Sequence, residues 1–274
     1  MSDGAPSPGD PLSSLRAQLA ATHPACTVRW IARTGSTNAD LLAEARSGQL
    51  DGPALLVTAQ QTAGRGRQGR VWADDARTSV LCSVAWPFPP QHDIRALSLA
   101  VGVWLAQALH ALGAASVRLK WPNDLLLPGA GPWRKLGGVL VEMADTASAR
   151  WAVIGFGINL RTPPGVPQAA GLDAAGLSLD RGQVLTALAP ALLAGLQGGA
   201  RQRDAALAQW NALHAWAGLA VSVQDRGQTQ FSGTALGLAP DGALRVQTPQ
   251  GERRVLSADV SLRLTATTAA DTAK

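Results

Sequence analysis

The chain has 274 residues, of which 46% are hydrophobic and 16% charged, and its formal net charge is +5. This length suits a large domain with a smaller one, and the hydrophobic content supplies a substantial core, which excludes a globally disordered chain. Two cysteines, Cys26 and Cys82, are too few for a disulfide framework or a zinc knuckle, and four scattered histidines show no close ligand spacing.

The N-terminal third alternates short apolar runs with turn signals. Residues 1–10 are rich in Ser, Pro and Gly and lack the basic and apolar parts of a secretory signal, so they are predicted to be a disordered tail. Thr37 and Asp40 have the spacing of a capping box, which predicts a helix that ends near Gly48. The other elements predicted here are a helix at 12–21, strands at 28–32, 54–59 and 79–86, and a Gly/Arg loop at 60–72.

The middle of the chain is more apolar. A long helix is predicted from about Asp93 to Leu112, with Gly113 ending it. The uncharged stretch 96–117 contains too many polar residues for a membrane span, so we expect a buried helix and a cytoplasmic protein without membrane segments. The elements predicted next are strands at 117–121, 138–143 and 151–159, a Pro/Gly loop at 161–176, and helices at 183–196, where Pro190 introduces a kink, and 203–216.

After Gly218 the pattern changes to short alternating segments separated by turn signals. Five strands are predicted, at 220–224, 229–236, 243–247, 252–256 and 260–264. Five short strands in about 45 residues indicate a small β-barrel. The predicted fold is therefore α+β, with a mixed β-sheet and flanking helices followed by this barrel. The predicted domains are an N-terminal tail and helix at 1–27, a first domain at 28–216, the barrel at 217–266 and a disordered tail at 267–274.

The loop from Gly64 to Arg70 formally matches G-x-G-x-x-G, yet no helix is predicted to open there, so a dinucleotide-binding fold is rejected. Its glycines would let the backbone approach a ligand, and its three arginines could grip phosphate or carboxylate. A mobile surface loop is an equally good interpretation of the loop taken alone. Trp72 beside it could stack on a base or belong to the core.

Lysine is scarce, because only three of the 24 basic residues are lysines: Lys120, Lys135 and Lys274. A retained lysine indicates a place that needs a compact ammonium group, although chance would explain a single case. Lys120 starts the segment Lys-Trp-Pro-Asn-Asp, in which Asp124 could hold Mg²⁺ while Lys120 reaches phosphate oxygens; an ordinary strand–turn junction is the alternative.

Two further segments combine glycines with polar residues. Lys135 is followed by Gly137 and Gly138, and Gly155 and Gly157 would share one face of a strand that ends at Asn159. In both segments the glycines could leave room for a flat ligand or serve packing alone.

These segments occur together in the order found in one enzyme family. The motifs are Ser36-Thr-Asn38, Gln61 to Trp72, Lys120 to Asp124, Lys135 to Glu142, and Gly155 to Asn159. In this set the sequence resembles the biotin protein ligases, specifically bacterial biotin–[acetyl-CoA-carboxylase] ligases, over about residues 28–266. The resemblance implies a class II synthetase-like catalytic domain, an SH3-like C-terminal domain, and the synthesis of biotinyl-5′-AMP from biotin and MgATP. It also implies transfer of biotin to one lysine of a biotin carboxyl carrier protein.

The resemblance also implies roles for individual residues. Ser36, Thr37, Asn38, Gln61, Gly64, Arg65 and Gly138 would surround biotin, and Arg67 and Arg70 would belong to a loop that covers biotin and phosphates. Trp72 would pack on adenine, Lys120, Asn123 and Asp124 would contact phosphate, Mg²⁺ and ribose, and Asn159 and Arg263 would approach the nucleotide. Lys135 would reach the carboxylate and the α-phosphate, and Lys135, Arg67 and Asp124 form the expected catalytic set, in which Asp124 also assists transfer.

The chemistry of the residues agrees with this assignment. Adenylation displaces pyrophosphate by a carboxylate, so it needs positioned cations more than a nucleophile, and no Cys or His lies in any motif. A lipoate or octanoate ligase of the same superfamily is the alternative enzyme. A biotin-responsive DNA-binding regulator is disfavoured, because only about 27 residues precede the first motif strand and the arginines are spread along the chain. We expect a monomer or homodimer without a specific nucleic-acid partner.

Overall fold

In the computed structural model, seven strands form a mixed sheet that begins with a parallel pair. The structure describes residues 11–70, 72, 78–129, 133–225, 227–256 and 260–265. The strand order is β1-β2-β3-β7-β6-β5-β4, in which β1 and β2 are parallel and the remaining pairs are antiparallel. The strands are β1 (Thr27–Thr34), β2 (Ala54–Gln61), β3 (Ser79–Phe88), β4 (Arg118–Lys120), β5 (Asp124–Leu127), β6 (Arg134–Asp145) and β7 (Arg150–Asn159). The predicted mixed sheet is therefore confirmed, whereas the two predicted tails, 1–10 and 267–274, lie outside the described residues.

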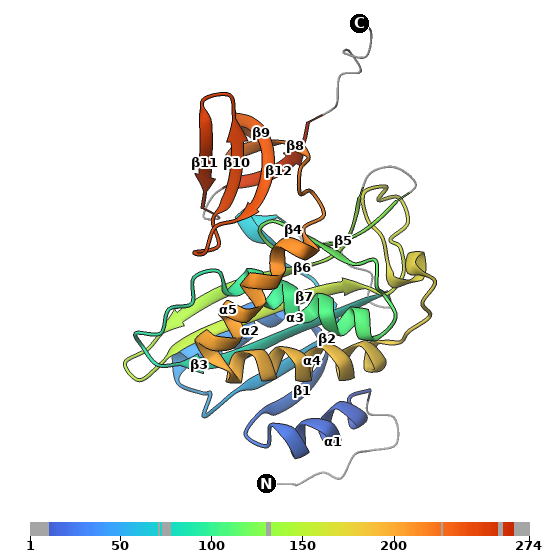
Figure 1. Ribbon diagram of the computed structural model, residues 1–274. Helices are drawn as coiled ribbons and strands as arrows, with labels where there is room; N and C mark the ends of the chain where they lie inside the picture. The colour runs from blue at the N-terminus through green and yellow to red at the C-terminus, as the bar shows by residue number, and fades with distance from the viewer. Residues whose placement is uncertain are drawn as a thin grey trace, which may run out of the picture.

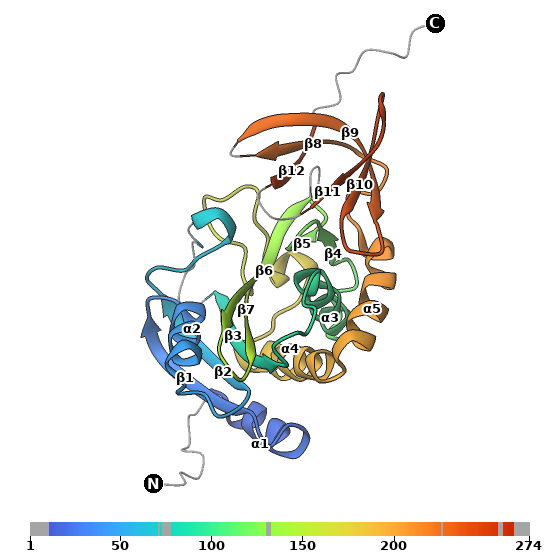
Figure 2. The same ribbon diagram turned by 90° about the vertical axis from the view of Figure 1, so that its left-hand side faces the viewer.

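Helices cover both faces of this sheet, as Figure 2 shows with the sheet seen nearly edge-on. On one face lies α2 (Thr37–Ser47), and on the other lie α3 (Leu97–Ala111), α4 (Arg181–Gln197) and α5 (Gly199–Trp210). The helix α1 (Ser13–Thr22) packs against α4. Each face has its own cluster of buried apolar side chains, a small one under α2 and a much larger one under α3 and α4.

Three helix starts differ from the prediction, and one of them is that of α5, which begins at Gly199 and not at Arg203. The N-cap of α2 is Ser36, whose hydroxyl accepts a hydrogen bond from the Ala39 amide, while Asp40 accepts one from the Thr34 hydroxyl instead of completing a capping box. The long helix α3 begins at Leu97 and not near Asp93, because Ala96 is left-handed with φ 59°. The predicted C-terminal ends of α2 and α3 are confirmed: Gly48 caps α2 in the left-handed conformation, and α3 ends two residues before Gly113.

The chain after α5 forms a second sheet, which stands above the first in Figure 1. Its strands are antiparallel in the order β11-β10-β9-β8-β12. They are β8 (Ala220–Asp225), β9 (Gln228–Leu238), β10 (Leu244–Thr248), β11 (Gly251–Val255) and β12 (Val260–Leu264), so a strand lies at each of the five predicted places. The predicted domain limits themselves stay a prediction.

The two sheets meet at β4 and the turn that follows it. The indole of Trp121, which is fully buried, donates a hydrogen bond of 3.3 Å to the Gly242 carbonyl of the second sheet. The segment after α5 returns to β4, because the Ala215 amide donates to the Leu119 carbonyl at 2.8 Å and His214 forms a parallel bridge with Leu119. The end of β4 is therefore fixed by residues from the C-terminal part of the chain.

Among the described residues, the structure has no single helix that is long and apolar enough to cross a membrane. Only α4 together with the helical segment from Gly199 to Leu213 meets the length and composition criteria, and this pair is bent by 118°. The apolar stretch 96–117, predicted to be a buried helix, corresponds to α3, and ten of the 15 residues of α3 are buried.

His214 allows a prediction about acid stability. Its side chain is buried against Trp210, neither ring nitrogen has a hydrogen-bond partner among the described residues, and burial lowers its pKa from 6.5 to about 4. Between pH 6.5 and pH 4, His214 binds a proton in the unfolded chain but not in the folded chain. The free energy of unfolding therefore falls as the pH drops from 6.5 towards 4. At about 1.4 kcal/mol per pKa unit, we expect a loss of about 3 kcal/mol from this residue.

The measurement is urea unfolding between pH 7 and pH 4. The variant His214→Phe keeps a ring against Trp210 but cannot titrate, so its stability should fall less than that of the wild type over this range. Equal pH dependence of the two proteins would contradict the assignment. The variant His110→Phe is the control, because the His110 ring has a hydrogen-bond partner in the Val117 carbonyl.

Candidate ligand-binding and active site

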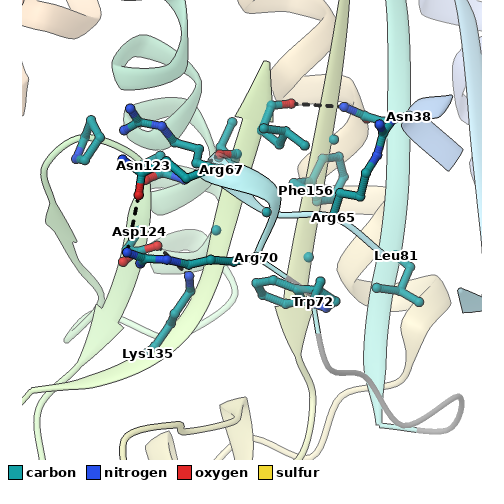
Figure 3. A pocket seen from close by; sticks show the side chains of 18 of the residues that line it. Asn38, Arg65, Arg67, Arg70, Trp72, Leu81, Asn123, Asp124, Lys135 and Phe156 are labelled. Carbon is teal, nitrogen blue, oxygen red and sulfur yellow. Dashed lines mark hydrogen bonds and ion pairs between the residues drawn. The ribbon is translucent and has the colours of Figure 1, made fainter. Parts of the chain in front are cut away.

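One cavity lies between α2, the face of the first sheet that α2 covers, the Gly/Arg loop and the end of β12. It encloses about 1030 Å³ of space between protein atoms, part of it open to solvent. Figure 3 shows its side chains, with Asn38 and Arg65 at one end and Asp124 and Lys135 at the other. Four of the five sequence motifs contribute predicted site residues to its lining, and the fifth, on β7, contributes two of the glycines of its floor.

Glycines keep the floor of this cavity flat. Gly155 and Gly157 lie on the same face of β7, and Gly138 of β6 is the register partner of Gly157. A Cβ at Gly155 would overlap the Asn38 amide, and one at Gly157 would lie 2.6 Å from the Trp72 ring. Side chains at these positions would therefore fill the space that α2 and Trp72 now border.

Neutral polar groups are hydrogen-bonded to one another at the α2 end. The Thr37 backbone amide donates to the Gln61 side-chain carbonyl at 2.9 Å, and the Thr37 hydroxyl lies 3.1 Å from the same carbonyl oxygen. The Thr37 and Ser83 hydroxyls share a hydrogen bond of 2.6 Å, and the Ser83 hydroxyl donates to the Asn38 carbonyl at 2.6 Å. Because Thr37, Asn38 and Ser83 are all buried, this network fixes the orientation of each group.

Glu142 of β6 extends this network towards the Gly/Arg loop. The Asn38 side-chain amide donates to its carboxylate at 2.9 Å, and the Arg65 guanidinium lies 3.7 Å from the other carboxylate oxygen. Glu142 therefore joins the start of α2 to the first arginine of the loop.

The opposite end of the cavity holds a carboxylate between two ammonium groups. The Lys135 ammonium lies 2.6 Å from one Asp124 oxygen, and the Lys120 ammonium 3.4 Å from the other. Burial raises the pKa of Asp124, but Lys135 and Lys120 together outweigh it, so the pKa lies below its usual range and the carboxylate is ionised at neutral pH. Burial lowers the pKa of Lys120, with the charges of Arg263 and Lys135 acting in the same direction.

The cavity has a strong excess of positive charge. Among the described residues that line it, six are basic and one, Asp124, is acidic. The basic residues are Arg65, Arg67, Arg70, Lys120, Lys135 and Arg263. Such a lining favours a ligand with several negative charges, and the neutral network at the other end favours an uncharged polar group.

Most of the residues predicted from the sequence meet in this cavity. Those that line it are Ser36, Thr37, Asn38, Gln61, Arg65, Arg67, Arg70, Trp72, Lys120, Asn123, Asp124, Lys135, Gly138 and Arg263. Two others are not part of its lining. Gly64 accepts a backbone hydrogen bond from Trp72 at the base of the loop, and Asn159 is buried at the end of β7, where Ala170 and Ser79 engage its amide.

Some predicted site residues also hold the site together. The Asn123 side chain donates to the Val139 carbonyl at 2.8 Å, which closes the β4–β5 turn onto β6. Ser83 and Glu142, which complete the network, were not predicted as site residues. The only signal for Ser83 is a polar residue within an apolar strand, and Glu142 ends a motif without standing out from it.

The comparisons with known proteins agree with the motifs. Residues 30–159 match the family described as "Biotin/lipoate A/B protein ligase family", and residues 218–263 match "Biotin protein ligase C terminal domain". The chain is 41% identical over 148 residues to a "Biotin--[acetyl-CoA-carboxylase] ligase" of Mycobacterium tuberculosis, which is 49% of this chain and 49% of that protein. The chain thus spans about half the length of this relative.

Two other relatives are covered more fully. The "Bifunctional ligase/repressor BirA" of Escherichia coli is 34% identical over 237 residues, which is 83% of this chain and 71% of that protein. A "Biotin--[acetyl-CoA-carboxylase] ligase" of Paracoccus denitrificans is 32% identical over 246 residues, 84% of this chain and 98% of that protein. In fold, the chain is similar to the biotin protein ligase of Aquifex aeolicus solved with biotin and ATP, with a TM-score of 0.73 and 24% identity over 87% of this chain and 99% of that one.

Proposed function

The chain belongs to the biotin/lipoate A/B protein ligase family, and on that premise we propose that it is an ATP-dependent biotin–protein ligase. It forms biotinyl-5′-AMP from biotin and MgATP and then transfers biotin to a lysine of a biotin carboxyl carrier protein. The observation that carries this proposal is one continuous cavity with a neutral hydrogen-bonding end and a cationic end. Because the reaction consumes ATP, its proposed location is the cytoplasm.

The neutral end suits the ureido ring of biotin, which is planar, uncharged and both a donor and an acceptor. Thr37 and Asn38 at the start of α2 present oriented polar groups, with Ser36 and Gln61 beside them, and Gly138 leaves space on the floor. Arg65 lies at the edge of this region, and the Trp72 ring borders the cations, with its centroid 5.3 Å from the Lys135 ammonium. A site made of fixed neutral groups binds such a ring without the desolvation cost of an unpaired charge.

The cationic end suits the triphosphate and the reacting carboxylate. A biotin carboxylate oxygen bonds to the α-phosphorus as the bond from that phosphorus to the bridging oxygen breaks, and pyrophosphate leaves with the electron pair. Lys135 is assigned to the carboxylate and α-phosphate, and Lys120 and Arg263 are assigned to the phosphates. Arg67 and Arg70 belong to the loop that borders this end of the cavity. Fixed cations stabilise the charge on both groups as the bonds change.

In the second step the neutral acceptor amine attacks the biotinyl carbonyl carbon, the bond from that carbon to the AMP oxygen breaks, AMP leaves with the electron pair, and the extra proton on the amine nitrogen passes to solvent water. Asp124 is held ionised by the two lysines, so it accepts hydrogen bonds readily but is a weak base. Its proposed role in transfer is therefore to orient the lysines and the incoming amine. Asn123 and Asn159 support the nucleotide end through the strands that they fix.

The residues do not fit a metal ion held by the protein itself. Asp124 is the one carboxylate among the described residues lining the cavity, it is engaged with two ammonium groups, and the described chain has no cluster of three metal-ligating side chains. Magnesium is accordingly treated as part of the substrate MgATP, and a direct bond between it and Asp124 stays a prediction.

The test of the proposed function is pyrophosphate release from MgATP with and without biotin, with lipoate as the comparison ligand. We expect release to depend on biotin and to be negligible with lipoate. Incorporation of labelled biotin into a purified carrier domain then tests the second step. Release that is independent of biotin, or that lipoate supports better, would overturn the proposal.

Arg263 gives a prediction that separates the two ends. Its side chain is exposed, lines the cationic end and comes from β12 of the second sheet, whereas the neutral end is built by the first sheet and α2. The variant Arg263→Ala should raise the KM for ATP by about five- to tenfold, which is less than the full effect of a buried charged hydrogen bond because solvent screens this exposed side chain, and leave the KM for biotin within about twofold. Arg253→Ala, on β11 outside the cavity, is the matched control.

A further inference from the structure

Lys120 has an aromatic neighbour from the segment that joins the two sheets. The Trp216 ring centroid lies 4.7 Å from the Lys120 ammonium, and Trp216 itself is only 6% exposed. The bridge between His214 and Leu119 and the hydrogen bond from Ala215 place the ring there. Trp216 does not line the cavity, so its effect on the site passes through Lys120.

Lys120 needs such a neighbour because its surroundings are otherwise unfavourable. Its side chain is 13% exposed, and burial and the neighbouring cations lower its pKa. Its carboxylate partner Asp124 is 3.4 Å away and is shared with Lys135, which lies closer at 2.6 Å. An aromatic face attracts a cation without accepting a conventional hydrogen bond, so it leaves the N–H groups of the ammonium for other oxygens.

We propose that Trp216 is a positioning residue that holds the Lys120 ammonium for the phosphates of ATP. This inference rests on the proposed function. A phosphate that enters the cavity competes with Asp124 for Lys120, because both are anionic acceptors, but it does not compete with the ring. Trp216 is thus the neighbour that keeps Lys120 in place both before and after the nucleotide binds.

The first experiment measures the KM for ATP and for biotin in Trp216→Met, which fills most of the space without a ring, and in Trp216→Phe, which restores an aromatic face. We expect the KM for ATP to rise by about fivefold in the methionine variant, to recover at least in part in the phenylalanine variant, and the KM for biotin to change less than about twofold. Trp104→Met is the matched control: Trp104 is 7% exposed, packs against Gly195 on the opposite face of the sheet, and should affect thermal stability alone.

A double-mutant cycle separates positioning from general loosening of the fold. In a Lys120→Met background the substitution Trp216→Met should no longer change the KM for ATP, because the cation that it holds is absent. An equal change in both backgrounds would overturn the inference. If the wild-type protein releases no pyrophosphate with biotin, the proposed function fails and the inference with it. If the wild type is active and Trp216→Met keeps the wild-type KM for ATP, only the inference fails.

A second measurement needs no variant of Trp216. The chain has three lysines, so lysine labelled with ¹³C at the methylene beside the ammonium gives one signal for each of them. The signal that is missing in Lys120→Arg is that of Lys120. We expect the signal of the Lys120 methylene beside the ammonium to be shifted upfield by the ring and to stay so when the α,β-methylene analogue of ATP binds. Loss of this shift on binding would overturn the inference even if Trp216→Met failed to fold.

Discussion

Replacing Lys135 with arginine is expected to lower the rate of biotinyl-AMP formation by at least about tenfold, although the positive charge is kept. The Lys135 ammonium lies 2.6 Å from Asp124, 5.3 Å from the centroid of the Trp72 ring and 3.4 Å from where a Cβ on Gly138 would lie. A guanidinium is planar and larger and cannot occupy this point with the same contacts. Misplacing one cation that stabilises the developing charge typically costs about 3 kcal/mol, and tenfold is a cautious estimate from that value.

The measurement is biotin-dependent pyrophosphate release at saturating ATP, with folding checked by a thermal melt. Lys120→Arg should act mainly through the KM for ATP. Lys274→Arg is the control because Lys274 lies outside the described residues and outside every motif. A folded Lys135→Arg protein with the wild-type rate would remove Lys135 from the catalytic set.

Adding one methyl group at Gly155 is expected to raise the Kd for biotin by at least about thirtyfold. The new Cβ would overlap the Asn38 carbonyl and lie 3.3 Å from the Ser83 hydroxyl. Asn38 would have to move, and it would break hydrogen bonds with Ser83 and Glu142 that orient it. Losing two buried hydrogen bonds costs about 2–3 kcal/mol, which corresponds to this factor.

Isothermal titration of Gly155→Ala with biotin, in the absence of ATP, measures this effect directly. Gly52→Ala is the control, because a Cβ there would make only an ordinary contact of 3.4 Å with the Ala25 carbonyl. Biotin affinity in Gly155→Ala within threefold of the wild type would show that the Asn38 network does not form the binding site.

Much of the fold could be predicted because apolar and polar residues alternate with the period of each element. All five strands of the second sheet were found in this way, since turn residues separate them clearly. Strand β5 (Asp124–Leu127) was missed because Pro122 and Asn123 indicate a turn and the three leucines after Asp124 are too few to indicate a strand. This segment is a strand because it pairs with β6, and the residues of the segment alone do not show that pairing.

The site was predictable in its motifs but not in the contacts between them. Lys120, Asp124 and Lys135 could be nominated from the sequence, whereas their arrangement around one carboxylate depends on the register of β4, β5 and β6. Trp216 could not be nominated, because it lies 96 positions from Lys120 in a segment without a motif. Asn159 shows the opposite case. It belongs to a motif like that of the family, but its side chain forms hydrogen bonds with Ala170 and Ser79 outside the cavity lining.

The separate apolar clusters on the two faces of the first sheet have a consequence for amide hydrogen exchange. Only three residues of α2 (Leu41, Leu42 and Ala45) are in its small cluster, while α3 and α4 share the large one. The α2 layer should therefore open at a lower free energy than the rest, and its amides should exchange earlier than those of α3. A ligand held by Thr37 and Asn38 binds only the closed form, so it should slow exchange in α2 far more than in α3.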